Sequence, residues 1–456
     1  MSAGRVYFDI TDIVRYAVAN DRVSGIQRVQ FNLIAYLGRK HGGQAVRCIF
    51  FHSDVLGMVE VDPTRLFDID EYDSTALLQK LGLERRRWML PSRSKMKSYL
   101  RPYNDNKLLR IAKKIDVLAS SFFMPRRLEA MGLRRQEESY SLLPMTQVER
   151  LPPGAHYVAL SINASNEHLT RFAREHVRHG GDMVQLVHDL IPQVCPQYLT
   201  AGAVQTYMRW LEELVRLAPR VLCVSEWTAN DLRRYIGPDA GRWSIKAAPL
   251  AHEFDGFARN ADVMASSPKL DSLQGRPYVL CVGTLEVRKN GITLLQAWKQ
   301  VVAQHPGSTV LAFAGKQGWL IKEFSELLGA SPELAGRVVL VDSPSDRELA
   351  WLYRHCLFTA YPSYYEGWGL PVGEGAWFGK YCVASQASSI PEVCQDLIDY
   401  VDPADPADMA RKILRALSDP AYVAERERAI AAAPLRKWSD VADAIYQEVT
   451  GLAASH

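Results

Sequence analysis

The stretch FTAYPSYYEGWGLPVGEGAWFGKYCVASQASSIPE, residues 358–392, decides the fold of this chain. Apolar residues run into a Pro-Ser-Tyr-Tyr turn, Glu366 and a Gly-Trp-Gly sequence follow, and Pro371 then opens a segment that carries Glu374. Proline suits the first position of a helix, where its missing N–H is not needed. The pattern predicts a strand, a tight loop and the start of a helix.

The predicted loop and helix start suit a ligand with phosphate at its centre. Gly367 and Gly369 lack a Cβ, so the backbone there can approach a ligand closely. Free amides at a helix start, together with the helix dipole, favour an anion such as a diphosphate. Glu366 and Glu374 bracket this point and can bind hydroxyl-bearing groups on both sides. A sugar nucleotide has this layout.

Two further motifs accompany the Glu366-x7-Glu374 pattern. They are SSIPEV at residues 388–393 and VGTLEVRKN at residues 282–290, each at a predicted strand-to-helix junction. In this order the three motifs resemble the retaining glycosyltransferases of family 4, and EGWGLPVGE is similar to bacterial O-antigen and exopolysaccharide enzymes. The resemblance covers the C-terminal half of the chain and short pieces of the N-terminal half. It implies an α/β protein of the GT-B fold, with two Rossmann-like domains that face each other across a cleft.

Length and composition agree with a two-domain protein of ordinary globular type. At 456 residues the chain exceeds what one core usually supports, and a net charge of +3 implies little. The seven cysteines are scattered and form no CxxC, which argues against a disulfide framework or a zinc site and for a reducing compartment. Charges interrupt the first residues too early for a signal peptide, and no run of eighteen apolar residues occurs. We therefore expect a cytoplasmic protein, or one held at the cytoplasmic face of the inner membrane.

Apolar runs that end in polar residues indicate where the domains divide. The runs near residues 157–163, 183–192 and 221–232 alternate with helix-like sequence, as in a parallel sheet with crossovers. A second series begins near residue 277. We expect an acceptor-binding domain at 1–255, a nucleotide-sugar-binding domain at 256–430, and a helix at 431–456 that, as in the family, crosses back to the first domain.

Three residues of the N-terminal half are candidates for the site. His188 and Asp189 fall at the end of a predicted strand, where open α/β sheets bind ligands. Their His-Asp-x-x-Pro context resembles the family's active-site histidine, which implies a catalytic or acceptor-binding role. Gly25 either approaches the donor phosphates, as a loop glycine does in the family, or only begins a helix.

The segment 85–114 is compositionally distinct. It holds eleven Lys or Arg and a single acid, Asp105, with interleaved aromatic and aliphatic residues. Such a segment can bind an anionic bilayer, or it is a solvated insertion. Nucleic-acid binding is not expected, because no recognition motif accompanies the charge.

In VGTLEVRKN, Arg288 and Lys289 are predicted to neutralise the diphosphate and to stabilise the leaving nucleoside diphosphate. The family usually carries an arginine directly after the glycine, and Thr284 takes that position here, so Arg288 and Lys289 carry more of the charge.

The resemblance implies that Glu374 binds the ribose hydroxyls and that Glu366 lies by the donor sugar. The expected catalytic residues are Glu366, His188 and Lys289. The expected donor-binding residues are Gly25, Gly283, Thr284, Arg288, Lys289, Gly367, Gly369, Leu370 and Glu374.

The function we expect is transfer of a hexosyl unit, with retention of configuration, to a surface polysaccharide or lipid-linked glycan. GDP-mannose is the first choice of donor, and UDP-hexoses stay open. No cofactor or metal is expected, since Asp68-Ile-Asp70 imitates a metal-binding DxD but lies far from the donor motifs. One alternative is a catalytically silent sugar-nucleotide-binding scaffold, and another is a sugar epimerase or phosphorylase on the same fold.

Overall fold

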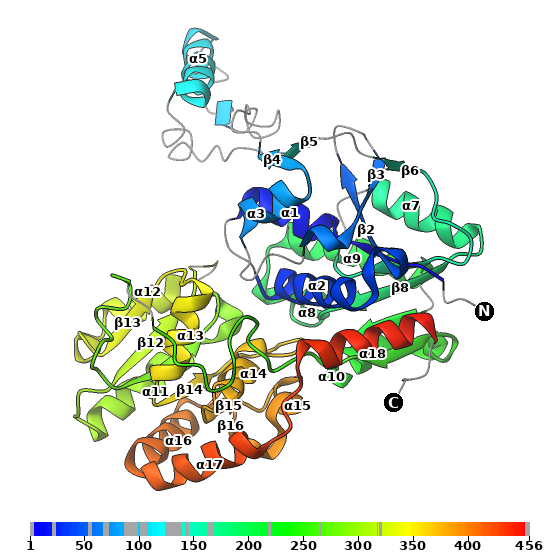
Figure 1. Cartoon of the computed structure of the whole chain (residues 1–456). Helices are drawn as coiled ribbons and strands as arrows, with labels where there is room; N and C mark the ends of the chain where they lie inside the picture. Colours follow the sequence, from blue (N-terminus) through cyan, green and yellow to red (C-terminus); the bar gives the residue numbers. More distant parts are fainter. Residues whose placement is uncertain are drawn as a thin grey trace.

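A computed structural model describes residues 4–20, 24–52, 57–66, 73–85, 99–100, 107–123, 139–141, 146–162, 167–217, 220–264, 267–316, 318 and 322–451. The described residues form two large sheets, each with helices on both faces (Figure 1), and one short two-stranded sheet. The last strand of the first sheet ends at Ala247, and the first strand of the second begins at Tyr278. Among the described residues, no helix is both long and apolar enough to cross a bilayer.

The N-terminal sheet has eight strands in the order β10-β9-β8-β7-β1-β2-β3-β6. Six of these strands run parallel, while β3 is antiparallel to both β2 and β6 at one edge. The strands are β1 Val6–Asp9, β2 Val46–His52, β3 Gly57–Val61, β6 Gln147–Val148, β7 His156–Ala159, β8 Asp182–Val187, β9 Arg220–Cys223 and β10 Ser244–Ala247. The helices are α1 Thr11–Ala19, α2 Gly25–Ala45, α3 Ser74–Lys80, α7 Glu167–Arg178, α8 Ile191–Val194, α9 Ala201–Leu217 and α10 Glu226–Ile236.

The C-terminal sheet has six strands, all parallel, in the order β13-β12-β11-β14-β15-β16. This is the strand order of a Rossmann fold, with the topological switch between β11 and β14. The strands are β11 Tyr278–Val282, β12 Val310–Ala314, β13 Val338–Val341, β14 Phe358–Tyr361, β15 Cys382–Ser385 and β16 Asp399–Val401. The helices are α11 Gly291–Gln304, α12 Lys322–Gly329, α13 Asp346–His355, α14 Leu370–Trp377, α15 Ile390–Cys394, α16 Pro406–Ser418 and α17 Pro420–Ala432. Every residue of β11, β12, β14 and β15 is buried, because helices cover both faces.

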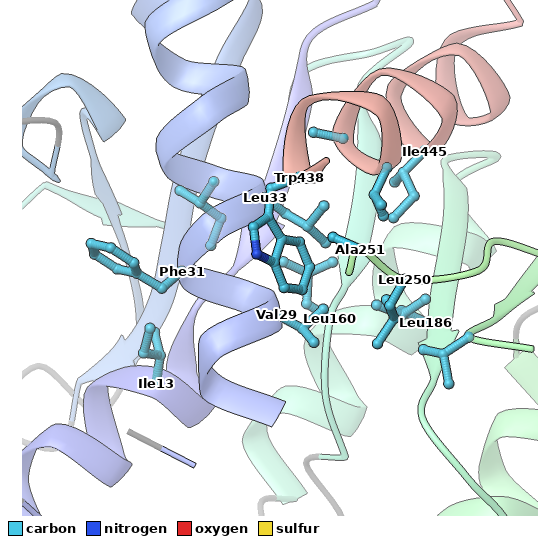
Figure 2. Close-up of a cluster of buried hydrophobic side chains, with 14 of the residues drawn as sticks. Ile13, Val29, Phe31, Leu33, Leu160, Leu186, Leu250, Ala251, Trp438 and Ile445 are labelled. Carbon is cyan, nitrogen blue, oxygen red and sulfur yellow. The ribbon is translucent and has the colours of Figure 1, made fainter. Parts of the chain in front are cut away.

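The chain crosses between the domains twice, and the two crossings lie side by side. The backbone N–H of His252 donates to the carbonyl of Arg436 at 2.9 Å, and the Arg436 guanidinium donates to the carbonyl of Leu250 at 2.9 Å. After the second crossing, α18 (Trp438–Thr450) packs on α2 of the N-terminal domain (Figure 1). Figure 2 shows Trp438 among the aliphatic side chains of that domain, so the last helix completes its core.

Most of the basic segment 85–114 lies outside the described residues. Its described parts are Arg85, residues 99–100 and the start of α5 (Lys107–Phe123). Two short antiparallel strands, β4 (Leu83–Arg85) and β5 (Ser139–Ser141), flank this part of the chain. In Figure 1, α5 stands away from the N-terminal sheet.

Candidate active site

The two domains enclose a cleft at the carboxyl ends of their strands. Its volume is about 870 Å³. Residues that follow strands of both sheets line it, among them His188 after β8, Gly283 after β11 and Gly315 after β12. All the residues that the sequence predicts for the site line this one cleft: Gly25, His188, Asp189, Gly283, Thr284, Arg288, Lys289, Glu366, Gly367, Gly369, Leu370 and Glu374.

Glu366 is the centre of an ion-pair cluster in the cleft wall. The Nζ atom of Lys289 lies 2.6 Å from one carboxylate oxygen, and Nη1 of Arg288 lies 2.8 Å from the other. The hydroxyls of Ser363 and Tyr361 donate to the first oxygen at 2.6 and 2.9 Å. Burial by itself would raise the pKa of Glu366, but Arg288 and Lys289 outweigh burial and lower this pKa to about 2. Glu366 is therefore ionised at any physiological pH.

Arg288 has contacts that differ from its predicted role. Beyond Glu366, it donates to the carboxylate of Glu286 at 2.5 Å and to the carbonyl of Tyr365 at 2.6 Å. In return, the backbone N–H of Tyr364 donates to the carbonyl of Arg288 at 2.9 Å. The guanidinium is thus engaged with the loop that carries Glu366, and its predicted contact with a diphosphate stays a prediction. Arg288 and Lys289 both line the cleft, and both are paired with Glu366.

Glu374 lies on α14 and also lines the cleft. The Tyr353 hydroxyl donates to its carboxylate at 3.0 Å, and Nε of Arg28 is 4.0 Å from it. Burial raises the pKa of Glu374, and the attraction of Arg28 and the hydrogen bond from Tyr353 offset only part of this rise. A carboxylate can accept about four hydrogen bonds, so Glu374 has capacity for ligand hydroxyls.

Arg28, which the sequence analysis missed, spans the cleft from the N-terminal domain. Its Nη2 atom lies 2.7 Å from a carboxylate oxygen of Asp346, the first residue of α13. Its guanidinium also lies 4.9 Å from the ring centroid of Phe254. Nothing in the sequence distinguishes Arg28 from the other basic residues of helices. Its position three residues after Gly25 is the only signal that could have pointed to it.

Two helices, one from each domain, begin at the same point of the cleft. Gly25 is the first residue of α2 and Leu370 the first of α14. A Cβ atom added at Gly25 would lie 3.4 Å from Cδ1 of Leu370. Helix N-termini present free N–H groups and the positive end of the helix dipole. Together with Lys289 and Arg28, they make this point of the cleft suited to an anion.

The two glycines after Glu366, Gly367 and Gly369, are needed for different structural reasons. A Cβ at position 367 would clash with the carbonyl oxygen of His188, so Gly367 allows the two domains to touch. The sequence analysis did not foresee this contact, and the expected close approach of a ligand at Gly367 stays a prediction. Gly369 has φ 106° and is the N-cap of α14, a conformation that other residues rarely adopt.

His188 is buried at the end of β8. One ring nitrogen, Nε2, lies 2.8 Å from the carbonyl of Leu160 and must therefore donate its proton to it. This fixes the tautomer and leaves Nδ1 as an acceptor. Burial lowers the pKa of His188, so the ring is neutral at pH 7. Asp189 accepts the N–H of Ile191 at 3.0 Å, which caps α8.

The C-terminal half of the chain matches a known family. Residues 263–436 match the family described as Glycosyl transferases group 1. This half carries a glycosyl transferases group 1 domain. Glu366, Glu374 and Lys289 all lie inside the matched range, as does Asp346.

Curated relatives match part of the chain. The serotype-specific mannosyltransferase WbdA of Escherichia coli is 30% identical over 201 residues, which are 42% of this chain and 24% of WbdA. The O-antigen chain mannosyltransferase B of Escherichia coli is 28% identical over 239 residues, 52% of this chain and 62% of the relative. The chain thus spans about a quarter of the first relative and less than two thirds of the second.

Solved structures match the whole chain. A complex of Anabaena HepE with UDP and glucose has a TM-score of 0.59 at 14% identity and covers 98% of this chain and 100% of HepE. Sucrose-phosphate synthase from Thermosynechococcus elongatus has a TM-score of 0.56 at 17% identity, and the match covers 97% of this chain and 98% of the synthase. At such identities the likeness concerns the fold, and it confirms the predicted GT-B fold.

In the VGTLEVRKN motif, the backbone of Gly283 lies against the side chain of Lys289. Gly283 has φ 146°, and a Cβ there would lie 3.6 Å from Cε of Lys289. Thr284, in place of the arginine that the family usually carries, lines the cleft beside it.

Of the described residues, no three His, Cys, Asp or Glu are grouped so that they could hold a metal ion. Asp68 and Asp70 lie outside the described residues.

Proposed function

We propose that this protein is a retaining glycosyltransferase that moves a hexosyl unit from a nucleotide sugar to a glycan acceptor. One observation carries the proposal: Glu366 with Lys289 comes just before the start of α14, Glu374 with Arg28 comes within its first turns, and all four residues line one cleft. This arrangement offers a positive centre between two hydroxyl acceptors. A nucleoside diphosphate sugar has the complementary chemistry, with ribose and hexose hydroxyls on either side of a diphosphate.

The donor would lie along the cleft with its diphosphate at Lys289 and the amides of Gly369 and Leu370. Glu374 would accept hydroxyls of the ribose. The hexose would then lie between Glu366 and His188, whose Nδ1 can accept a hydroxyl proton. Asp189, tied to the start of α8, would border the acceptor.

The charge state of Glu366 argues for an electrostatic role. A carboxylate whose pKa is about 2 is a poor general base, because it binds protons weakly. It can instead favour positive charge that develops on the hexose as the bond to the leaving phosphate breaks. The acceptor hydroxyl would pass its proton to the leaving phosphate, and attack on the same face retains the configuration. Lys289 would stabilise the charge of the departing diphosphate without a metal ion.

The donor we place first is GDP-mannose. Both Escherichia coli relatives are named as mannosyltransferases, and one of them as an O-antigen chain enzyme. UDP-hexoses are the second choice, because the solved HepE structure holds UDP and glucose. The acceptor would be an O-antigen or exopolysaccharide chain, or its lipid-linked precursor, on the cytoplasmic side of the inner membrane.

Nucleotide binding and turnover test this proposal together. GDP, UDP, dTDP and ADP would be compared by thermal shift, where a ligand at one hundred times its dissociation constant stabilises the fold by about 2.7 kcal/mol. Release of nucleoside diphosphate from the matching sugar nucleotide, with acceptor present, would establish transfer. Nucleotide binding without release of nucleoside diphosphate would favour a silent scaffold. Release in the absence of an acceptor would favour an epimerase. A protein that binds none of the four nucleotides would exclude the proposed donor site.

Helix α5 is the part of the basic segment through which we propose contact with an anionic membrane. The side chains of Leu109, Ile111 and Ile115 are 43%, 51% and 59% exposed, although all three are aliphatic. Lys107, Arg110, Lys113 and Lys114 lie on the same helix with one acid, Asp116. Apolar side chains beside basic ones suit the surface of an anionic bilayer, where each basic residue contributes about 1 kcal/mol.

Liposome sedimentation would test this contact. Replacing Ile111 and Ile115 with serine should reduce binding to vesicles that contain phosphatidylglycerol. The matched control replaces Leu340 and Leu357, which are 43% and 39% exposed in the C-terminal domain, and should leave binding unchanged. Equal binding by both variants would exclude α5 as the contact.

A further inference from the structure

The segment before α15 holds the backbone on both sides of Glu366. The N–H of Glu366 donates to Oγ of Ser388 at 2.8 Å, and Oγ of Ser389 donates to the carbonyl of Glu366 at 2.9 Å. Ser389 also donates to the carbonyl of Trp368 at 3.2 Å. The position of Glu366 in the cleft is therefore coupled to the position of this segment.

Three residues further on, Glu392 bonds to the other domain. Its two carboxylate oxygens accept the backbone N–H groups of Glu226 and Trp227 at 2.8 and 2.7 Å. These are the first two amides of α10, and the third, that of Thr228, donates to Ser225 at 3.0 Å. The free amides at the start of an N-terminal helix are thus capped by a carboxylate from the C-terminal domain.

Two more contacts join α10 to the loop that carries Glu366. The hydroxyl of Thr228 donates to the carbonyl of Gly367 at 3.3 Å. The hydroxyl of Tyr365 donates to the carboxylate of Asp231, which is buried and also pairs with Arg234. Both contacts are made by the immediate sequence neighbours of Glu366, so α10 contacts the loop directly on either side of this residue in the sequence.

We infer that Glu392 is a positioning residue that couples the packing of the two domains to the placement of Glu366 in the cleft. The serine pair, Ser388 and Ser389, transmits the coupling. It bonds to the backbone of Glu366 and directly precedes the five-residue helix α15, in which Glu392 accepts amides of α10. The inference depends on the proposed function for its catalytic consequence. Glu392 itself would touch neither donor nor acceptor, since it does not line the cleft.

The variant Glu392→Ala tests the coupling in two independent ways. We expect kcat for transfer to fall about tenfold or more with KM for the donor changed less than about twofold, because a shift of about 1 Å in a catalytic group can cost about 100-fold. We also expect faster amide hydrogen exchange at residues 366–368 as well as at 226–227. Glu392→Gln keeps one acceptor oxygen and should give an intermediate value for both measurements.

Asp73→Ala is the matched control. Asp73 also accepts two backbone amides at a helix start, those of Thr75 and Ala76 at 2.7 and 3.0 Å, but within one domain. Its loss should change exchange only around α3 and leave kcat unaltered. The coupling would be overturned if Glu392→Ala changed exchange only at 226–227 and kcat by less than about twofold. A wild-type protein without turnover would refute the proposed function, and the exchange measurement would still decide the coupling.

Discussion

Two glutamates line the cleft, Glu366 before the start of α14 and Glu374 within it, and their surroundings, called the two ends below, differ in a way that the sequence spacing hides. Glu366 is paired with two cations within 2.8 Å and has its pKa lowered to about 2. Glu374 has a tyrosine hydroxyl at 3.0 Å and a guanidinium nitrogen at 4.0 Å, and its pKa is raised. Although only eight positions separate them, the two carboxylates suit different tasks. Glu366 balances the charge of two fixed cations, and Glu374 can accept hydrogen bonds from ligand hydroxyls.

Lys289→Ala should break the Glu366 end most severely. It leaves the charge of the departing diphosphate without its cation, and loss of one such group typically costs about 100-fold to 1,000-fold in kcat. Steady-state release of nucleoside diphosphate would measure the loss. Lys299→Ala, which removes a pair with Glu333 at 2.9 Å outside the cleft, is the control and should keep full activity. Equal activity of both variants would remove Lys289 from the site.

The free energy of unfolding should depend on pH with opposite signs at Glu366 and at Glu374. The lowered pKa of Glu366 contributes stability above its usual value of 4.5, and that contribution is lost as pH falls from 4.5 towards 2. Glu366→Gln should therefore cost on the order of 3 kcal/mol at pH 7, and less below pH 4.5. Urea unfolding at several pH values would measure this.

The raised pKa of Glu374 reverses the sign, because stability falls as pH rises from 4.5 through its folded value. Glu374→Gln should leave the unliganded protein at pH 7 as stable as wild type or more so. The same loss of stability in both glutamine variants would contradict the contrast between the two ends.

Of the two glutamates, only Glu374 is expected to affect nucleotide affinity. Loss of its charged hydrogen bonds to ribose hydroxyls should weaken binding about tenfold, since such bonds contribute about 1.5 to 3 kcal/mol. In wild type, affinity should fall as pH decreases through the raised pKa of Glu374, because the protonated form accepts fewer hydrogen bonds. Isothermal titration calorimetry between pH 5 and pH 8 would show this slope, and Glu374→Gln should abolish it.

The smallest effect is expected at Arg28. Arg28→Lys keeps the charge opposite Asp346 but loses the planar guanidinium over Phe254, so donor affinity should change about threefold or less. Arg28→Ala should weaken donor binding further while leaving Glu366 and its pKa unaltered. A loss of kcat in Arg28→Lys as large as in Lys289→Ala would show that the two ends of the cleft are not separate.

The sequence predicts the C-terminal part of this site well because its residues are contiguous. Strand β14, the turn, Glu366 and the start of α14 occur in seventeen residues from Phe358 to Glu374, so local signals suffice to place them. Arg28 and Asp346 could not be predicted, since only the packing of the two domains brings α2 and α13 together. The contact of Gly367 could not be predicted for the same reason, because the backbone it meets belongs to His188 of the other domain.

Helix α18 has a consequence for how the chain is made. Its Trp438 and Ile445 belong to the core of the N-terminal domain, so that domain is discontinuous in sequence (Figure 2). During synthesis, the N-terminal domain lacks part of its own interior until residue 450 has been added. The C-terminal sheet, whose strands all lie between residues 278 and 401, is complete well before that point. The domain that is begun first is therefore the one that finishes folding last.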